Sequence, residues 1–315
     1  MAVIGLDLGG TKLAGACFDD AGNILLREVA QLGGRTGKEV GMIICELANY
    51  LISSLQSEVS ISAIGLSVPG IAYVETGTVW APNIPGWEAY PIVQELTDSL
   101  EMDLPVLLDS DRSCYILGEA WKGKAKDCKH AIYMAVGTGI GIGVMIDGRI
   151  LRGKGNIAGA IGWMALHHPY HEKYNACGCF EYHASGTGLA RVARELLDAQ
   201  PSYGGPLGRL QGDPTAQDVF IYAAEGDSIA QQVLDEAIVY WGMAIANLVS
   251  IFNPESIILG GGVFGPASQF LDQIQAEAKK WAQPISIKQV KLEVSELGGN
   301  AGLIGAGYLA LRASL

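Results

Sequence analysis

The sequence predicts an α/β protein built from two related halves. Short apolar runs bounded by turn residues alternate with longer segments of helical periodicity, which is typical of sheets covered by helices. The chain has 315 residues, enough for one large domain or two moderate ones, because single cores rarely grow past roughly 250–300 residues. A glycine-containing hairpin pattern at the N-terminus recurs in the middle of the chain. If the repeat is real, two related domains face each other across a ligand-binding cleft.

The N-terminal half is expected to begin with three antiparallel strands and to continue as alternating helices and strands. Turn residues separate the three apolar runs, as in consecutive hairpins. The expected elements are strands at 3–8, 13–18 and 24–29, a helix at about 39–57, a strand at 61–68 ended by Pro69-Gly70, a helix near 91–100, a strand at 105–109 and a helix from 111 to 121.

The second half repeats the hairpin. With a shift of 128 residues, Ile4, Leu8, Gly9, Gly15 and Asp19 fall on Ile132, Val136, Gly137, Gly143 and Asp147. The following Asp147-Gly148 pair is typical of a tight hairpin turn. A chance match between apolar strands is the alternative explanation. Beyond a hairpin at 131–151, we expect helices at about 188–200, 215–224 and 229–251, a short strand at 257–259 and a closing helix at 303–311.

Composition narrows the function classes. The chain has 33 acidic and 21 basic side chains and a net charge of −12, which argues against a surface for nucleic acid or an anionic membrane. Hydrophobic residues make up 49% of the chain, enough for a real core, so overall disorder is excluded. The 42 glycines lie in clusters without a period, which indicates a role for the bare backbone.

The sequence gives no sign of a secretory leader or a membrane span. The N-terminus lacks a basic region followed by a long apolar run, and the longest uncharged stretch, 237–254, has fewer apolar residues than the roughly 20 of a span. The six cysteines are scattered, mostly inside apolar runs, as expected of reduced thiols. We therefore expect a soluble, cytoplasmic protein.

Three glycine-rich turns are candidate phosphate-binding loops. Backbone N–H groups hold phosphate oxygens best where no Cβ blocks a close approach. The first turn also supplies a hydroxyl and a positive charge, and the third suits the passage of bare backbone under a flat base or sugar. Plain hairpin or flexible turns are the alternatives. The candidates are Asp7-Leu8-Gly9-Gly10-Thr11-Lys12, Gly137-Thr138-Gly139-Ile140-Gly141 and Gly260-Gly261-Gly262.

Together with further motifs, these turns resemble the ROK family of sugar kinases, within the actin, Hsp70 and hexokinase superfamily. The resemblance covers nearly the whole chain. The further motifs are Pro69-Gly70, Asn83-Ile84-Pro85-Gly86-Trp87, Asp109-Ser110-Asp111, Gly155 to Met164, Gly178-Cys179-Phe180-Glu181 and Ala301-Gly302-Leu303-Ile304-Gly305. The resemblance implies a two-domain actin-like ATPase fold of the ribonuclease H-like type with an interdomain cleft. We expect an N-terminal domain at 1–118 plus 300–315 and a larger domain at 119–299.

The resemblance also implies a catalytic residue. ROK kinases carry an Asn-Asp-Ala-Asn type segment whose aspartate sits at the hydroxyl that becomes phosphorylated, and the matching segment here is Ser110-Asp111-Arg112-Ser113. Asp111 is therefore expected to be the catalytic base. Without the family, an ordinary N-cap of the following helix is the preferred interpretation.

Further site residues follow from the resemblance. Magnesium is expected near Asp7, where it would bridge the β- and γ-phosphates of ATP, and Thr11 and Thr138 are expected to donate to phosphate oxygens. The remaining expected ATP-binding residues are Gly9, Gly10, Lys12, Gly137, Gly139, Gly260, Gly261 and Gly262. The expected sugar pocket is lined by Gly70, Asn83, Ser110, Asp111, Trp163 and Glu181.

One departure from the family affects the sugar pocket. The family usually reads Gly-Glu-x-Gly-His where this chain has Gly159-Ala160-Ile161-Gly162-Trp163. Each lost hydrogen bond to a charged group is worth on the order of 1.5–3 kcal/mol, which predicts at least roughly tenfold weaker binding of a glucose-like ligand. Trp163 offers an apolar face on which a pyranose ring or an acyl or aromatic substituent can stack. Core packing is the alternative for Trp163.

A second departure concerns the family's structural zinc. Counting back from Cys179 puts Glu172 and Tyr174 at two positions where the family has cysteine, and Trp163 replaces the histidine ligand. One ligand of four remains, so we expect no structural zinc. A rebuilt metal site is the alternative, because the segment holds His167, His168, His171, Cys177, Cys179 and His183.

The sequence thus predicts a kinase that transfers the γ-phosphate of ATP to a hydroxyl of a hexose or hexose-like substrate, with ATP and Mg²⁺ as cofactors. The resemblance to the family also implies a homodimer built through the second domain. A catalytically weak sugar-binding or scaffold protein of the same fold is the main rival. A sugar-sensing repressor is the other, but such proteins carry a DNA-binding segment before the first phosphate motif, and here Asp7 lies almost at the start of the sequence.

Overall fold

The computed structural model describes residues 1–55 and 58–313. These residues form two compact units: unit 1 comprises the described residues within 1–128, 143–158 and 296–313, and unit 2 comprises 129–142 and 159–295. Both segments expected for the N-terminal domain lie in unit 1, as far as they are described. Unit 1 also contains 119–128 and 296–299 and, as the main difference from the expected boundaries, the segment 143–158. Side-chain contacts explain this: Arg152 pairs with Asp109, and Arg312 donates to the carbonyl of Gly148.

The secondary structure alternates as expected along most of the chain. The strands are β1 (Ala2–Leu8), β2 (Lys12–Asp19), β3 (Ile24–Gln31), β4 (Ile61–Val68), β5 (Ile71–Tyr73), β6 (Thr78–Trp80), β7 (Val106–Ser110), β8 (Ala131–Val136), β9 (Ile140–Ile146), β10 (Arg149–Ile150), β11 (Ser256–Gly260) and β12 (Lys291–Val294). The α-helices are α1 (Gly37–Leu55), α2 (Ile92–Ser99), α3 (Asp111–Lys122), α4 (Cys179–Ala184), α5 (Gly186–Ala199), α6 (Ala216–Ala224), α7 (Ser228–Phe252), α8 (Leu271–Trp281) and α9 (Ala301–Ala313). The end of the helix expected at 39–57 includes residues 56 and 57, which lie outside the described residues.

Two five-stranded sheets share one strand order. The first sheet runs β3-β2-β1-β4-β7 and the second runs β10-β9-β8-β11-β12. In the first, an antiparallel meander of β1 to β3 is extended by β4 and β7, which are parallel to β1. In the second, β10 pairs antiparallel with β9, and β11 and β12 are parallel to β8. The internal repeat predicted from the two hairpins is confirmed at the level of topology.

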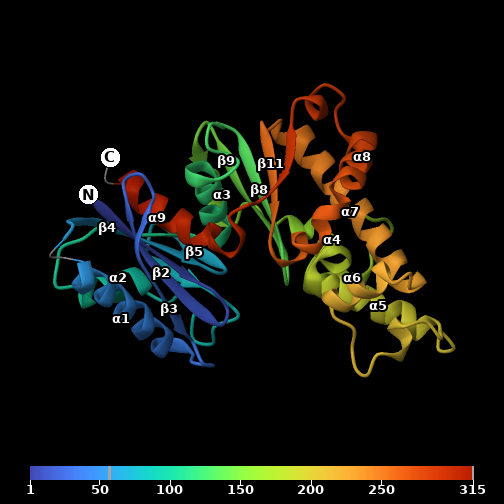
Figure 1. Cartoon of the computed structure of the whole chain (residues 1–315), viewed down its shortest axis with the longest axis horizontal. Helices are drawn as coiled ribbons and strands as arrows, with labels where there is room; N and C mark the ends of the chain where they lie inside the picture. Colours follow the sequence, from blue (N-terminus) through green and yellow to red (C-terminus); the bar gives the residue numbers. More distant parts are fainter. Residues whose placement is uncertain (56–57, 314–315) are drawn as a thin grey trace. The chain divides into compact units, whose positions relative to one another are not determined.

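The first sheet is covered on both faces. Side chains of β1 alternate, so that Ile4 and Leu6 pack with α1 in one core and Val3 packs with α9 in another. Figure 1 shows α1 and α2 on one side of this sheet and α9 on the other. Glycines let α9 come unusually close, because a Cβ at Gly5 would lie 2.6 Å from the backbone nitrogen of Gly307.

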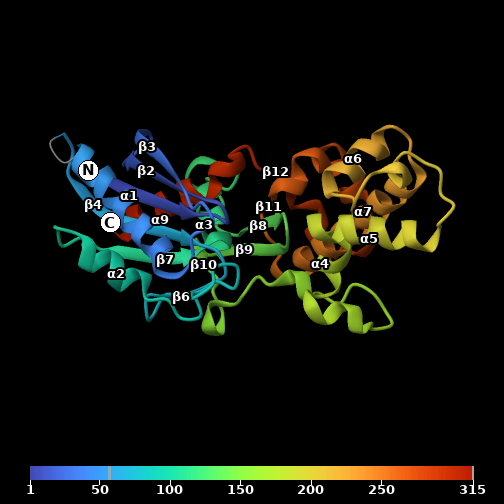
Figure 2. The same ribbon diagram turned by 90° about the horizontal axis from the view of Figure 1, so that it is seen from below.

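Unit 2 is built around its longest helix. α7 packs against α4, α5, α6 and α8, and Figure 2 shows α5, α6 and α7 side by side. By length and composition α7 is apolar enough to cross a membrane, but 61% of its most apolar window is buried inside the protein. A helix that is apolar around most of its circumference is expected in the core of a domain of this size.

Candidate active site

The first expected phosphate loop joins β1 to β2 as a tight turn. The N–H of Gly9 donates to the carbonyl of Lys12 at 2.9 Å, and the loop between them is exposed. A Cβ at Gly10 would meet nothing within 4 Å, and Gly10 does not have a positive φ. Neither packing nor backbone conformation therefore explains this glycine. The hydroxyl of Thr11 and the ammonium of Lys12 are available beside it.

Asp7 lies just before this turn and is half-buried between β4 and the start of α9. Its carboxylate accepts a hydrogen bond of 2.7 Å from the hydroxyl of Ser67. A Cβ at Gly302 would lie 2.6 Å from both carboxylate oxygens, so α9 begins directly against them. Burial raises the pKa of Asp7 to about 6; the Ser67 hydrogen bond opposes this rise, and the negative charge of Asp111 adds to it. Such a carboxylate gains from a nearby cation.

The expected catalytic segment lies where β7 ends and α3 begins. The N-cap of α3 is Ser110, whose hydroxyl accepts from the N–H of Ser113 at 3.3 Å. Asp111 is the first residue of the helix, so the interpretation of Asp111 as the N-cap is wrong. Its side chain is 28% exposed, and one carboxylate oxygen accepts from the N–H of Arg112 at 2.7 Å. Burial raises the pKa of Asp111, and the charge of Arg112 opposes this rise.

Two other expected sugar-pocket residues also belong to unit 1. Gly70 follows β4 with a φ of +85°, and a Cβ there would overlap the carbonyl oxygen of Trp80. Its own carbonyl accepts a hydrogen bond from Arg112 at 3.1 Å, which links it to the start of α3. Asn83 is exposed on the turn before the buried Trp87, whose indole N–H donates to the carbonyl of Gly37. The anchored Trp87 holds this turn in place.

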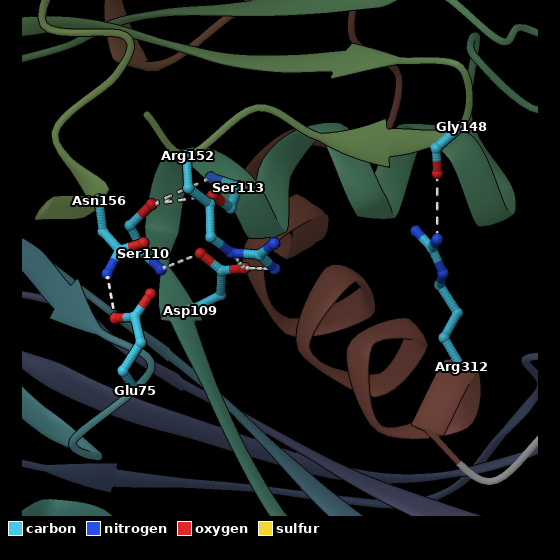
Figure 3. Close-up of polar contacts among 8 residues, drawn as sticks. All are labelled: Glu75, Asp109, Ser110, Ser113, Gly148, Arg152, Asn156 and Arg312. Atoms are coloured by element: carbon cyan, nitrogen blue, oxygen red, sulfur yellow. Dashed lines mark hydrogen bonds and ion pairs between the residues drawn. The ribbon is translucent and has the colours of Figure 1, made fainter. Parts of the chain in front are cut away.

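Sequence reasoning missed a polar network that supports this region. Figure 3 shows Arg152 reaching the carboxylate of Asp109, one residue before the N-cap of α3. In the same view Asn156 donates to the carboxylate of Glu75 at 3.0 Å. Both contacts bind the segment after β10 to the first sheet and its β5–β6 hairpin. No local motif marks these pairs, because their members lie 43 and 81 residues apart.

Unit 2 contains a pocket of about 770 Å³ that brings two of the expected glycine turns together. Its walls come from the turn after β8, the start of α5, helix α6 with the segment before it, and the turn after β11. The lining residues are Gly137, Thr138, Gly186, Thr187, Ala190, Pro214, Thr215, Ala216, Gln217, Phe220, Ile221, Gly262, Val263 and Pro266. Such a cavity is large enough for a nucleotide-sized ligand.

The five glycines of unit 2 that were expected to bind ATP fall into two classes. At Gly139, Gly260 and Gly261, packing already forbids a side chain, because a Cβ would approach the Glu181 carboxylate, the Tyr133 hydroxyl and the Val136 backbone respectively. At Gly137 and Gly262, which line the pocket, a Cβ would meet nothing within 4 Å and φ is not positive. Protein packing does not explain these two glycines. Their bare backbone is therefore available for close approach by a ligand.

The start of α5 gives the pocket an electropositive end. The helix has 14 residues and is capped by Ser185, whose hydroxyl accepts from the N–H of Gly188 at 2.9 Å. The N–H of Gly186 donates to the carbonyl of Gly137 at 2.7 Å, and the hydroxyl of Thr187 donates to the carbonyl of Thr138 at 2.8 Å. A helix N-terminus favours anions such as phosphate. Sequence reasoning missed Gly186 and Thr187, although Ser185 two residues earlier is a typical N-cap signal.

Glu181 and Trp163 have different surroundings in unit 2. Glu181 accepts a hydrogen bond of 2.7 Å from the N–H of Ile140, so its carboxylate stabilises the backbone of the glycine turn between β8 and β9. Burial raises the pKa of Glu181, and this hydrogen bond opposes the rise. The indole of Trp163 is 60% exposed, so the alternative that Trp163 packs in the core is wrong.

The histidine-rich segment forms an aromatic cluster. The Nε2 of His183 lies 3.0 Å from the hydroxyl of Tyr174, and its ring stacks on Tyr240 with centroids 4.6 Å apart. Burial lowers the pKa of His183 to about 4. Within residues 1–55 and 58–313, no group of three or more His, Cys, Asp or Glu side chains has the geometry to hold a metal ion.

Comparisons with known proteins agree with this architecture. The sequence model of the ROK family matches residues 3–313. A glucokinase from Halalkalibacterium halodurans is 34% identical, with 97% of this chain and 94% of that protein covered. Among solved structures, a ROK hexokinase from Thermus thermophilus has a TM-score of 0.81 at 30% identity, covering 100% of this chain and 99% of that one. A ROK glucokinase from Streptomyces griseus, in complex with glucose and AMPPNP, has a TM-score of 0.73 at 26% identity, covering 99% and 100%.

The family match spans nearly the whole chain, and each of the two structural matches covers 99% or more of it. They confirm the two-domain actin-like ATPase fold expected from the sequence. On these grounds the chain belongs to the ROK family.

Proposed function

We propose that this chain is an ATP-dependent sugar kinase, which transfers the γ-phosphate of ATP to a hydroxyl of a hexose or hexose-like acceptor. The observation that carries this function is the 770 Å³ pocket, where two glycines unexplained by packing meet the N-terminus of α5. Relatives over nearly the full length are glucokinases, and one similar structure holds glucose and AMPPNP. In a chain of this family, a pocket suited to the phosphates of a nucleotide supports kinase chemistry.

The pocket suits the two ends of a nucleotide. Phe220, Ile221 and Val263 contribute an apolar wall for a flat base, while Gly137 and the α5 N-terminus offer backbone N–H groups and a positive dipole to phosphates. Phosphoryl transfer needs little covalent help from the protein, and positioning with charge stabilisation supplies most of the rate. Lys12, Thr11 and Thr138 are proposed to contribute to that stabilisation.

Mg²⁺ is the proposed metal cofactor, and Asp7 fits it. A hard cation prefers oxygen ligands, and the Asp7 carboxylate is half-buried with a pKa of about 6, so a bound cation would favour its charged form. Magnesium, when bound, supplies charge neutralisation on the phosphates of the donor.

Asp111 is the proposed catalytic base for the acceptor. A carboxylate within hydrogen-bond reach of a hydroxyl orients it and accepts its proton as the bond to phosphorus forms. The proposed acceptor contacts in unit 1 come from Gly70, Asn83 and Ser110, and those in unit 2 from Trp163 and Glu181. The exposed indole of Trp163 is proposed to stack on the ring or on an apolar substituent of the acceptor.

The remaining expectations are also proposals. The net charge of −12 supports a protein that binds neither nucleic acid nor an anionic membrane, and we propose that it works in the cytoplasm. A homodimer through unit 2 is supported by the exposed apolar side chains of Ile251, Trp281 and Ile285. Absence of structural zinc is supported by the lack of a suitable ligand group among the described residues, and elemental analysis of purified protein tests it.

Substitutions at the two unexplained glycines test the function. Gly137→Ala and Gly262→Ala should leave the fold intact, because a Cβ meets no protein atom there, but should weaken AMPPNP binding at least tenfold. Calorimetry measures the affinity, and Gly299→Ala, which also meets nothing, is the matched control. Unchanged affinity in both variants would place the nucleotide elsewhere.

A panel of hexoses, N-acetylhexosamines and polyols with Mg-ATP then tests the transfer itself. Asp111→Asn should lose at least about a hundredfold in kcat, within the range of general base catalysis. The exposed Asp20→Asn serves as its control. If the panel binds but is not phosphorylated above the Asp111→Asn background, the catalytically weak sugar-binding or scaffold protein becomes the better description.

A further inference from the structure

The guanidinium of Arg112 lies between two parts of the proposed acceptor site. Its Nη2 donates to the carbonyl oxygen of Gly70 at 3.1 Å, and its Nε lies 3.9 Å from a carboxylate oxygen of Asp111. The side chain is 18% exposed. One planar group thus touches both the turn after β4 and the proposed catalytic base on α3.

Both ends of this bridge rest on constrained backbone. The carbonyl of Arg112 packs so closely against β9 that a Cβ at Gly143 would overlap it. Gly70 is held against the carbonyl of Trp80, and its φ of +85° is unfavourable for any other residue. The backbone at both ends is thus closely packed, and the guanidinium connects these two segments.

The charges around Asp111 give this contact an electrostatic role. Burial disfavours the ionised carboxylate, and the negative charge of Asp7 on β1 interacts unfavourably with it. On α3 itself, a hydrogen bond from Tyr115 favours the ionised form. Asp109 on β7 is already paired with Arg152. Arg112 supplies the positive charge that acts on Asp111 against its burial.

We propose that Arg112 is a positioning residue of the acceptor site, which keeps the Asp111 carboxylate ionised and holds it in register with the Gly70 carbonyl. The inference rests on the proposed role of Asp111 as base. It assigns to Arg112 a function separate from substrate contact, because Arg112 acts through its contacts with Gly70 and Asp111. A lysine ammonium supplies the charge but lacks the planar fork that serves two partners at once.

The full-length chain with Arg112→Gln and Arg112→Lys tests this role through a pH profile of kcat and kcat/KM, using the acceptor with the highest turnover. In Arg112→Gln the acidic limb of both profiles should move to higher pH by about one pH unit, because Asp111 loses a nearby opposite charge. The plateau of kcat should be at least about tenfold lower. Arg112→Lys should restore the position of the acidic limb but not the plateau. Lysine returns the positive charge beside Asp111 but not the planar group that also reaches the Gly70 carbonyl. The exposed Arg149→Gln should behave like the wild type.

A second measurement is independent of turnover. Carboxyl carbon NMR of the protein without ligands follows the titration of Asp111, assigned by its loss in Asp111→Asn. The titration should move to higher pH in Arg112→Gln and return toward the wild type in Arg112→Lys. If neither the Asp111 titration nor the acidic limb of the pH profile moves in folded Arg112→Gln, the positioning role is overturned. If instead the titration moves but no acceptor is phosphorylated by the wild type, the proposed function fails and the coupling of Arg112 to Asp111 stands.

Discussion

Arg152 donates from both Nε (3.0 Å) and Nη2 (2.5 Å) to a single carboxylate oxygen of Asp109, as Figure 3 shows. The other oxygen of Asp109 accepts from the N–H of Ser110 at 2.9 Å, so both sides of this carboxylate are engaged. Asp109 is 2% exposed. The pair binds the segment after β10 to the end of β7, next to the start of the proposed catalytic helix.

Removing this arginine should destabilise unit 1. Arg152→Ala leaves the buried Asp109 charge without its partner, and we expect a loss of about 2–4 kcal/mol in the free energy of unfolding. Urea unfolding followed by tryptophan fluorescence measures it, and the exposed Arg149→Ala is the control. Combining Arg152→Ala with Asp109→Asn should recover part of the loss, because the second change removes the buried charge. A loss below about 0.5 kcal/mol would show that solvent compensates Asp109.

Replacing Asp7 should stabilise the protein while impairing catalysis. The folded-state pKa of Asp7 is about 6, above the ordinary aspartate value of 3.8. The folded protein therefore binds more protons between these values, and stability falls as pH rises from about 4 to 6. Asp7→Asn should gain about 1–3 kcal/mol at pH 7, and the gain should vanish near pH 4.

Denaturant midpoints of Asp7→Asn and wild type at pH 4, 5, 6 and 7 check this, without added magnesium. Asp19, the last residue of β2, has a lowered pKa, so Asp19→Asn should show no such gain. A variant that is less stable than the wild type at pH 7 would show that the Asp7 carboxylate is compensated in the folded protein.

The close packing of α9 should depend on Gly305. A Cβ at this position would overlap the carbonyl of Cys114 on α3, and backbone atoms cannot rotate out of the way. Gly305→Ala should therefore cost about 1–3 kcal/mol of stability as α9 shifts, despite the better helix propensity of alanine. Gly299→Ala, where a Cβ meets nothing, should cost less than about 0.5 kcal/mol. Equal thermal midpoints for the two variants would contradict the packing argument.

The buried imidazole of His183 should make the protein sensitive to mild acid. Its folded-state pKa of about 4 lies below the ordinary histidine value of 6.5, so stability is lost as pH falls from about 6.5 toward 4. Because the ring is only partly buried, we expect this contribution to be about 1–2 kcal/mol. His183→Phe keeps the stack on Tyr240 and should flatten the dependence, while His168→Phe, at an exposed position, should not. Parallel pH curves for His183→Phe and wild type would refute the assignment.

Local sequence patterns predicted much of the secondary structure. The three strands after Met1, the helix that follows and the repeated hairpin were predictable, because alternation, helical periodicity and turn residues act over a few positions. The helix α8 and the strand β12 were not predicted, and neither was the short α4. Two of the four residues of β12, Lys291 and Glu293, are charged, and Lys291 is exposed. The place of β12 beside β11 depends on a partner more than thirty residues away. Pairing of that kind has no local signature.

The sequence by itself determined the family pattern, the repeated topology and the identity of the glycine turns, because these depend on residue type at fixed spacing. Only the tertiary structure decided that Ser110 rather than Asp111 caps α3, that Gly137 and Gly262 face a pocket while Gly260 and Gly261 serve packing, and that Arg152 and Arg112 support the proposed acceptor site. The physical reason is that caps, steric contacts and ion pairs are properties of atoms brought together by folding, across separations that no local pattern encodes.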